Sequence, residues 1–431
     1  MQKVKIIRLK NLPNKAKDIL KQGQKESANL WNFCVTTHMK ARESREKWPT
    51  KDFLQKQVKV SEDGIKKFSL HSQTSQMIIA RFLANVDTAC KIKKENKKIR
   101  LPYKEKYFYP LMWPKQGVKV QKGRILLPMG RGRDSLILPM KTENIQPGAC
   151  TIVWKNGYEL HIVYESEEGS KVESDVKATI DLGEIHLAAV TTSSGRSLVV
   201  SGREIRAQKR QINQSITRTS KKLQRCNKRS RKWKKLQRAK RKIIDRSKRR
   251  IRDLRHKGTT KVVNFCKENT VSTVFVGNPH GVRKKSIGKK HNQRVAGWEY
   301  GKDWEYIKYK SKQAGMESFN GSERGTSSQC PECSLKKKPN GRWWKCKNCG
   351  FECHRDVVGA LNMFPLAFGI KSKRPKDITY LRIPIGRSSS SLGTGQSCLN
   401  DCIGVSQPLV GVAQATVIPL YRFRTSSLLR A

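Results

Sequence analysis

Four cysteines late in the chain restrict its fold more than any other feature. They form two C-x2-C pairs separated by twelve residues: Cys330, Cys333, Cys346 and Cys349. Four thiolates at these spacings close a tetrahedral zinc site of the ribbon type. Two redox-active C-x-x-C motifs are the alternative. Because four thiolates leave no open position for water, we expect the zinc to be structural and not catalytic.

The charge of the chain indicates a polyanionic partner. Its 431 residues include 91 Lys and Arg but only 34 Asp and Glu, a formal net charge of +57. Residues 203–257 alone contain 25 basic and 3 acidic residues. A solvated charged face is the simpler interpretation of such a run, but this density and length favour contact with a nucleic-acid backbone.

The sequence gives no sign of a membrane protein. No apolar run approaches the ~18 residues of a spanning helix. The N-terminal residues MQKVKIIRLKNLPNKAKD lack the apolar segment of a signal peptide. We therefore expect a cytoplasmic protein with reduced thiols and no membrane partner.

The first part of the chain is predicted to combine a β-barrel with inserted helices. Residues 2–10 alternate as in a strand, and residues 15–45 and 72–92 carry apolar residues at helical spacing. From residue 99, repeated prolines exclude a long helix. We interpret 99–168 as a barrel that includes the N-terminal strand.

One turn of this barrel has a specific signature. Residues 151–164 read as a hairpin, and Asn156-Gly157 would supply the positive φ angles of a type I′ turn.

The second part of the chain alternates strands and helices. After three short strands from residue 176, the expected elements are a basic helical hairpin (203–257) bent near 226–231, a strand (270–278), a helix (292–315), a strand (316–322), the cysteine knuckle (326–350) and a helix (354–366). Residues 371–431 are basic and rich in serine and glycine, which predicts a largely disordered tail.

Two aspartates stand where this pattern could bring them together. Asp181 ends an apolar strand, and Asp356 begins a helix beside His354 and Arg355. Each has a simpler explanation, as a turn residue or as a complement to the helix dipole. An acid on the first of three consecutive strands is, however, the way an RNase H-like sheet presents its first metal ligand. Together the two aspartates indicate two-metal phosphodiester hydrolysis with magnesium.

Four segments carry a resemblance to a known family: TIDLGEIHLAAV around Asp181, FVGNPHGV around Asn278, ERGTSSQCPEC before the knuckle and KCKNCGFECHRDVVGALNM around Asp356. In these segments the chain resembles TnpB, the transposon-encoded RNA-guided nucleases of the OrfB type, which are compact relatives of type V CRISPR effectors. The resemblance covers about residues 1–370 and is most specific in 175–366. It implies a prokaryotic, nucleoid-associated enzyme with a guide RNA from its own locus. Its targets would be double-stranded and single-stranded DNA next to a short motif.

The resemblance also implies a multidomain α/β architecture. Its expected parts are a wedge β-barrel (1–13 and 99–170), a helical recognition domain inserted into it (14–98), a RuvC-like nuclease domain of the RNase H-like type (175–325 and 351–368) with the basic hairpin, a four-cysteine zinc ribbon (326–350) and the disordered tail (371–431).

The chain departs from the family pattern at its third acid. Most members carry a catalytic glutamate at the end of the strand that here reads VSTVFVGNPHG, where this chain has Gly277 and Asn278. An amide is a poor bridging ligand, so we expect Glu323 to replace that acid and to bind magnesium with Asp181 and Asp356. Glu317 on the neighbouring strand and Asp303 on the preceding helix are weaker candidates. Glu323 could instead only cap a turn.

Three functional interpretations follow. The first is an RNA-guided DNA endonuclease. The second, favoured by the missing glutamate, is a guide-dependent DNA-binding protein that does not cut, such as a repressor or retention factor. The third is a structural RNA-binding protein with a zinc ribbon, which the two well-placed aspartates disfavour.

Overall fold

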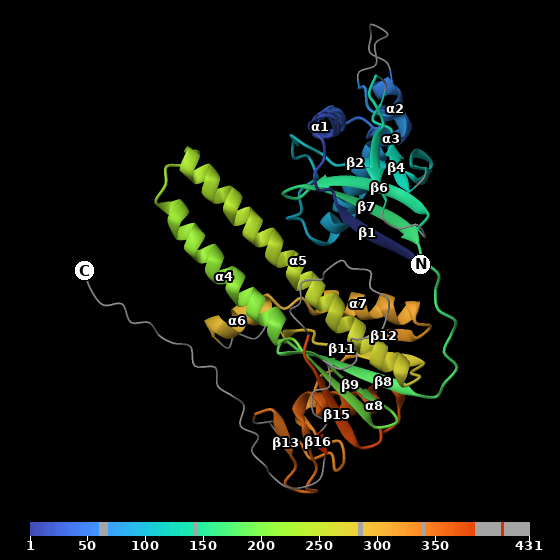
Figure 1. Ribbon diagram of the computed structural model, residues 1–431, viewed down its shortest axis with the longest axis vertical. Coiled ribbons are helices and arrows are strands. Elements are labelled where there is room, and N and C mark those ends of the chain that lie inside the picture. The colour runs from blue at the N-terminus through green and yellow to red at the C-terminus, as the bar shows by residue number, and fades with distance from the viewer. Residues whose placement is uncertain are drawn as a thin grey trace, which may run out of the picture. The chain divides into compact units, whose positions relative to one another are not determined.

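The computed structural model describes residues 1–59, 68–121, 123–130, 132–140, 145–282, 288–337, 341–383 and 407–408. The chain divides into two units, residues 1–168 with 222–245, and residues 169–221 with 246–431. Both have a mixed α/β composition (Figure 1). Within the described residues, no helix has the length and apolar character needed to cross a membrane.

The first unit combines helices with two antiparallel sheets. Its helices are α1 (Asn14–Glu43), α2 (Lys51–Lys59), α3 (Ser72–Glu95) and the short 3-10 turn η1 (Lys115–Gly117). Its strands are β1 (Gln2–Arg8), β2 (Leu111–Trp113), β3 (Lys119–Gln121), β4 (Arg124–Leu127), β5 (Leu136–Pro139), β6 (Pro147–Trp154) and β7 (Tyr158–Glu165). One sheet has the order β1-β7-β6-β2 and the other the order β3-β4-β5.

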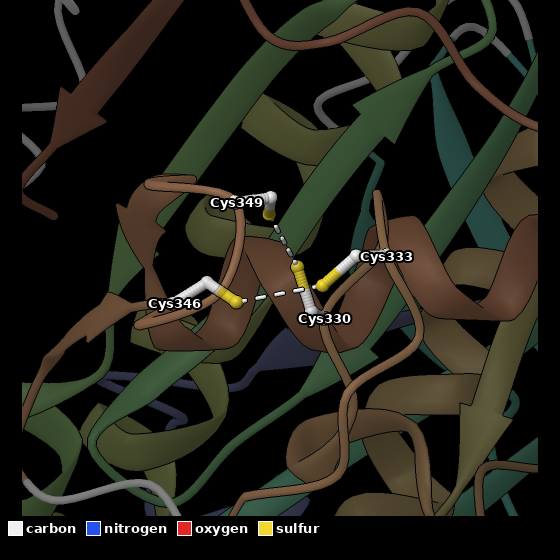
Figure 2. A group of neighbouring side chains, drawn as sticks. All are labelled: Cys330, Cys333, Cys346 and Cys349. Carbon is white, nitrogen blue, oxygen red and sulfur yellow. Dashed lines mark hydrogen bonds between the residues drawn. The ribbon is translucent and has the colours of Figure 1, made fainter.

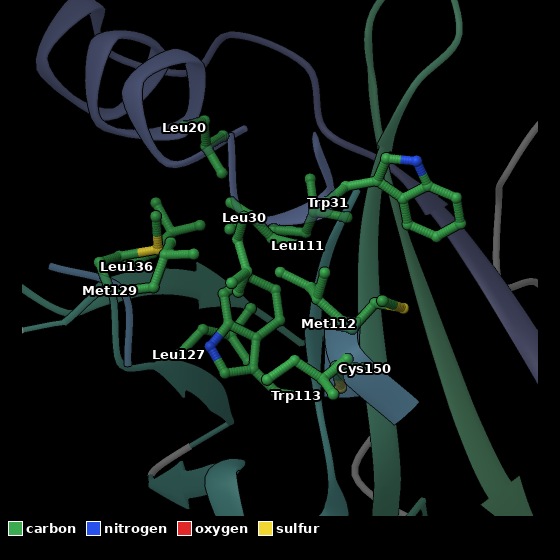
Figure 3. Close-up of a cluster of buried hydrophobic side chains, with 14 of the residues drawn as sticks. Leu20, Leu30, Trp31, Leu111, Met112, Trp113, Leu127, Met129, Leu136 and Cys150 are labelled. Atoms are coloured by element: carbon green, nitrogen blue, oxygen red, sulfur yellow. The ribbon is translucent and has the colours of Figure 1, made fainter. Parts of the chain in front are cut away.

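The helices and the strands of this unit share one hydrophobic core. Leu20, Leu30 and Trp31 of α1 pack in the same buried cluster as Leu111 and Trp113 of β2 (Figure 3). Gly23 lets α1 approach closely, since a Cβ there would lie 3.0 Å from Met129 and 3.2 Å from Leu111. The predicted helices are confirmed, and the helical segment and the strands fold around a common interior. Their division into recognition and wedge domains stays a prediction.

The predicted hairpin is confirmed, but its turn is longer than expected. Trp154 and Tyr158 form the pair that closes the ladder between β6 and β7, which leaves three residues in the loop. Asn156 and Gly157 both have positive φ, 53° and 138°. The turn is therefore a three-residue loop and not the two-residue type I′ turn.

The second unit is built on one mixed sheet. Its strands are β8 (Lys177–Leu182), β9 (His186–Thr192), β10 (Arg196–Ser201), β11 (Thr273–Asn278), β12 (Glu317–Ser322), β15 (Asp377–Leu381) and β16 (Gln407–Pro408). They lie in the order β12-β11-β8-β9-β10-β15-β16. Strands β8, β9 and β10 form an antiparallel meander. Strand β11 pairs in parallel with the other edge of β8, and β12 pairs in parallel with β11.

Helices cover both faces of this sheet. They are α4 (Arg203–Gln224), α5 (Arg231–Glu268), α6 (Lys289–Ala296), α7 (Tyr300–Gln313) and α8 (Arg355–Phe368), together with the 3-10 turn η3 (Thr326–Ser328). Ile180 of β8 packs with Leu254 of α5 and Ile307 of α7 in one core. On the other face, Thr179 Oγ1 donates to the Ala360 carbonyl of α8, 2.7 Å away. The alternation along β8 therefore directs Asp181 toward α8.

The basic segment is confirmed as a helical hairpin. Helices α4 and α5 are separated by a turn at residues 225–230, where Arg229 has φ 68° and Ser230 Oγ accepts the N–H of Trp233 (Figure 1). Ile205 at the start of α4 and the C-terminal part of α5 are buried in the core of the sheet. Most basic side chains of the hairpin are exposed or half-buried, as nucleic-acid contact requires.

One prediction on the second unit is wrong, and another, the largely disordered tail, is corrected for its first residues. The helix expected over 292–315 is two helices, α6 and α7, because the chain turns at Gly297, whose N–H bonds back to Gln293. The tail expected to be disordered from 371 contains β15, which pairs in parallel with β10. The rest of that tail beyond residue 383, apart from 407–408, lies outside the described residues.

Candidate metal centres

The four cysteines of the predicted zinc ribbon converge in the structure. Their sulfur atoms all lie within 4.8 Å of one another (Figure 2). Cys330 and Cys349 Sγ are 3.6 Å apart, and Cys333 and Cys346 Sγ are 3.5 Å apart. Sulfurs bound tetrahedrally to zinc at about 2.3 Å would be about 3.8 Å apart. The cluster therefore fits a zinc ion.

Backbone turns hold each cysteine pair in place. The Cys330 N–H donates to the Leu335 carbonyl, and the Cys346 N–H donates to the Phe351 carbonyl. The backbone N–H of Leu335 is also the main cause that lowers the pKa of Cys333 to about 6, whereas burial raises the pKa of Cys330 to about 12, so a bound ion would be needed to favour the thiolate there. Strands β13 (Trp343–Lys345) and β14 (Glu352–His354) close the second half of the ribbon.

The ribbon is continuous with the core of the second unit. Trp344, Cys346 and Phe351 share a buried cluster with Val199 of β10 and Val358 of α8. The zinc site and the sheet therefore support each other.

Three predicted acids meet on the α8 face of the sheet. Asp181 lies at the end of β8, Glu323 directly follows β12, and Asp356 lies in the first turn of α8. The pKa of Asp181 is raised well above its usual value, first by burial and then by the charges of Glu323 and Asp356. The three carboxylates therefore lie near enough to act on one another's ionisation.

Two glycines make room for these carboxylates. A Cβ on Gly277 would lie 2.4 Å from Glu323 Oε2, and a Cβ on Gly359 would lie 2.6 Å from Asp181 Oδ2. Gly277 and Asp181 each directly follow the last paired residues of the two strands, Val276 of β11 and Ile180 of β8. The Glu323 carboxylate therefore lies next to Gly277, at the strand end where the family pattern has its glutamate.

The backbone of Glu323 is fixed by the turn that follows it. Thr326 donates from its Oγ1 to the Glu323 carbonyl at 2.8 Å. Asn362 Nδ2 of α8 donates to the carbonyls of Thr326 and Gln329, both at 2.6 Å. The hydrogen bonds of Asn362 to the segment after Glu323 thus hold this acid beside α8.

The Glu323 side chain is only partly satisfied by the protein. Its Oε2 is buried without a hydrogen-bond partner among the described residues, and burial raises the pKa of this carboxyl to about 7. A buried carboxylate oxygen without a partner indicates a group absent from the polypeptide, and a divalent cation fits it.

Asp356 is held by residues that the sequence analysis did not identify. Burial alone would raise its pKa, but a hydrogen bond from His186 and the charges of His354, His186 and Arg342 lower it. His186 Nδ1 donates to Asp356 Oδ2 at 2.7 Å, and Arg342 lies 3.6 Å from the same oxygen. No sequence signal distinguished His186, because it lies 170 residues from Asp356.

The weaker candidates for the third acid lie elsewhere. Glu317 is at the opposite end of β12 and pairs with Lys171 at 3.2 Å. Asp303 is buried on α7, where it lies 3.5 Å from Arg255. Asn278 ends β11 next to Gly277. Within the described part of the chain, none of these three residues is among the charged groups that shift the pKa of Asp181.

The raised pKa of Glu323 predicts how the metal-free protein responds to pH. Since this carboxyl titrates near 4.5 when unfolded and about 7 when folded, the folded state binds more protons between these values. The free energy of unfolding should therefore fall as pH rises from 4.5 to 7, by more than about 1.4 kcal/mol, the equivalent of one pKa unit. Asp181 contributes in the same direction, while Asp356 acts only below pH 3.8.

Urea titrations of the metal-free protein at pH 5 and pH 7.5 measure this difference. Glu323→Gln should flatten the dependence. An unchanged pH dependence in that variant would refute the assignment to Glu323.

Comparison with known families agrees with the motifs. Residues 161–283 match the OrfB_IS605 family, described as a probable transposase, and residues 300–363 match the Cas12f1-like TNB domain. The first range includes Asp181, and the second includes Glu323, Asp356 and the four cysteines of the ribbon.

Among the proteins similar to the chain are two curated proteins and one solved structure. A TnpB-like protein of Methanocaldococcus jannaschii is 31% identical over 159 residues, which are 36% of this chain and 54% of that protein. The CRISPR-associated endodeoxyribonuclease Cas12f1 of an uncultured archaeon is 27% identical over 131 residues, 28% of this chain and 25% of that protein. The chain thus spans about half of the first relative and a quarter of the second.

The solved structure is a Cas12f1–sgRNA–target DNA complex. It matches with a TM-score of 0.60 at 14% identity, covering 81% of this chain and 83% of that chain. This match shows a shared fold. Together these comparisons confirm the resemblance to TnpB-type proteins.

Proposed function

We propose that this TnpB-type protein is an RNA-guided DNA endonuclease that cuts with a RuvC-like, magnesium-dependent site. The observation that carries the proposal is the meeting of Asp181, Glu323 and Asp356 on one face of the sheet, with a buried carboxylate oxygen left without a partner among the described residues. The order of the sheet, an antiparallel meander extended by two parallel strands, supports the RNase H-like assignment.

The three carboxylates would hold two magnesium ions. When bound, such ions activate water and stabilise the leaving oxygen of a phosphodiester. The residues of the chain supply the arrangement: β8 presents Asp181, the turn after β12 presents Glu323, and His186 orients Asp356. Burial shields Asp181 and Glu323 from water and raises the pKa of both carboxyls, so a divalent cation would take the place of their protons.

The remaining parts of the chain would bind nucleic acid. The basic hairpin of α4 and α5 would contact a guide RNA, and the zinc ribbon would contact the target strand. The first unit, with its expected wedge barrel and recognition helices, would read a short motif beside the target in double-stranded DNA. A cytoplasmic location at the nucleoid follows from these partners.

The alternative is a guide-dependent DNA-binding protein that does not cut. The glycine and asparagine at positions 277 and 278 favour it, because they replace the usual glutamate. The position of Glu323 over Gly277 favours the enzyme. One experiment tests both: the protein is purified with its RNA, the RNA is sequenced, and a matching duplex is incubated with magnesium or manganese. Binding without cleavage, with a verified guide, would make the second function the better one.

RNA binding should depend steeply on salt. For each phosphate neutralised, the slope of log K against log[salt] changes by about −0.9 for a duplex and −0.7 for a single strand. Replacing the exposed Lys232, Lys234 and Lys235 of α5 by alanine should therefore reduce the slope by about 2 to 3. Filter binding at several salt concentrations measures it.

The same three lysines replaced by arginine keep the charge and serve as the control. A preparation free of nucleic acid whose RNA affinity does not change with salt would contradict the role of the hairpin.

A further inference from the structure

A group of two histidines and one aspartate lies beside the three acids. His186, His354 and Asp356 each offer a ligand atom, and these atoms all lie within 4.8 Å of one another. They come from distant elements, since His186 begins β9 and His354 ends β14 and caps α8. The fold therefore assembles this group, and it is not a local sequence motif.

The same nitrogen of each ring faces Asp356. His186 Nδ1 is 2.7 Å from Asp356 Oδ2. His354 Nδ1 accepts the Asp356 backbone N–H at 3.3 Å, a long hydrogen bond. The two rings lie 5.0 Å apart at 67° to each other. His186 thus contacts the carboxylate and His354 the backbone of Asp356, and one ligand atom of each of the three residues lies within 4.8 Å of the others.

These distances fit a cation position. Neighbouring ligand atoms of an octahedral site with bonds of about 2.1 Å are about 3 Å apart, close to the observed N–O separation. The ring proton of His186 would move from Nδ1 to Nε2, so both imidazoles stay neutral. The two histidines are largely buried, with side-chain exposures of 11% for His186 and 6% for His354. An ion would displace the Arg342 guanidinium from Asp356, and this side chain is 45% exposed, so it has room to turn outward.

The chemistry of the donors selects the ion. Carboxylates suit magnesium, calcium and manganese, while imidazole suits transition metals. We propose that His186, His354 and Asp356 form a position for a divalent transition-metal ion, and that the site therefore prefers Mn²⁺ to Mg²⁺. This deepens the proposed function, since Asp356 would belong to both this position and the carboxylate site.

Manganese itself is the probe. The full-length zinc-loaded protein, freed of RNA and of any histidine tag, is titrated with Mn²⁺ by electron paramagnetic resonance, with Mg²⁺ as competitor. We expect Mn²⁺ to bind at least tenfold more tightly than Mg²⁺. Pulsed measurements should show coupling of the bound Mn²⁺ to nitrogen-14. No such coupling in the wild type would overturn the proposal without the need of any variant.

The variant His186→Asn/His354→Asn separates ligation from positioning. Asparagine at 354 keeps an acceptor for the helix cap, and asparagine at 186 keeps an N–H that can reach Asp356. We expect Mn²⁺ affinity to fall about tenfold, with Mg²⁺ affinity changed less than twofold and the nitrogen coupling lost. An unchanged preference for Mn²⁺ would show that the histidines only orient Asp356. Zinc content and circular dichroism confirm that the variant is folded, and His161→Asn in the first unit is the control.

A second variant separates this proposal from cleavage. In Asp181→Asn/Glu323→Gln the carboxylate site is lost, and the nitrogen coupling should persist. If the wild type never cuts DNA but shows the coupling, the nuclease proposal fails and the metal position stands. If the wild type cuts DNA but shows no nitrogen coupling, the metal position fails and the nuclease proposal stands.

Discussion

Replacing Glu323 by alanine is expected to lower the rate of DNA cleavage by about 10³-fold or more while guide-dependent DNA binding stays within a few-fold. In the proposed mechanism the metal ions would supply both the nucleophile and the stabilisation of the leaving group, so their loss would stop chemistry and not recognition. Asp181→Ala and Asp356→Ala should behave alike. Single-turnover cleavage and binding to the same labelled duplex measure the two effects.

The space around Gly277 offers a sharper form of this test. Gly277→Ala would place a Cβ 2.4 Å from Glu323 Oε2 and 2.6 Å from Met363 Cε. Both atoms are the ends of flexible side chains and can shift, but a shift of Glu323 Oε2 changes the position of the proposed third acid. We therefore expect this single methyl group to reduce cleavage strongly. Asn278→Ala leaves this space unchanged and is the matched control.

The third acid should also work when it is moved from position 323, after β12, to position 277 on β11. In Gly277→Glu/Glu323→Ala the new carboxylate would start from β11, in the volume that Glu323 vacates. We expect this double variant to cut measurably, and faster than either single variant. Cleavage at the wild-type rate by Glu323→Ala would show that the third acid is another residue.

Loss of zinc is expected to unfold the ribbon and to inactivate the protein. Cys330→Ser or Cys349→Ser should release about one equivalent of zinc, because structural zinc contributes about 10–16 kcal/mol of folding free energy in small zinc modules. The damage should reach the acids, since the ribbon shares a core with β10 and α8, and Asn362 ties the segment between Glu323 and Cys330 to α8. Cleavage should fall together with the zinc content.

Cys353 provides the control for this prediction. It is fully buried in the same hydrophobic cluster but lies outside the four-cysteine group. Cys353→Ala should therefore retain zinc. Elemental analysis and thermal unfolding distinguish the variants, and a wild-type protein without zinc would contradict the assignment.

The sequence was sufficient for the elements with strong local signals. Apolar residues at helical spacing identified α1 and α3, and the basic hairpin followed from its charge and its apolar stripe. Asp181 and Asp356 could be proposed as site residues because a strand end and a helix start are local features. Glu323 could be proposed only by comparison with the family pattern, since nothing in ERGTSSQC itself shows that its side chain lies over Gly277.

Long-range contacts account for what the sequence did not predict. His186 acquires its role from Asp356, which only the folded sheet brings within 2.7 Å. The break between α6 and α7 depends on tertiary packing, because Val295 and Trp298 on either side of Gly297 are both buried. Strand β15 was missed because its five residues, Asp377–Leu381, stand in a polar segment and gain order by pairing with β10.

That strand has a consequence for shortening the chain. Without β15, the backbone of β10 would become an unprotected edge, the kind of edge on which sheets of separate molecules join. Ile378 of β15 also belongs to the buried cluster that carries the zinc ribbon. A shortened version of this protein should therefore keep the chain through β15, although the matched family segments end at residue 363. Fusion partners belong beyond residue 383, where they leave this strand in place.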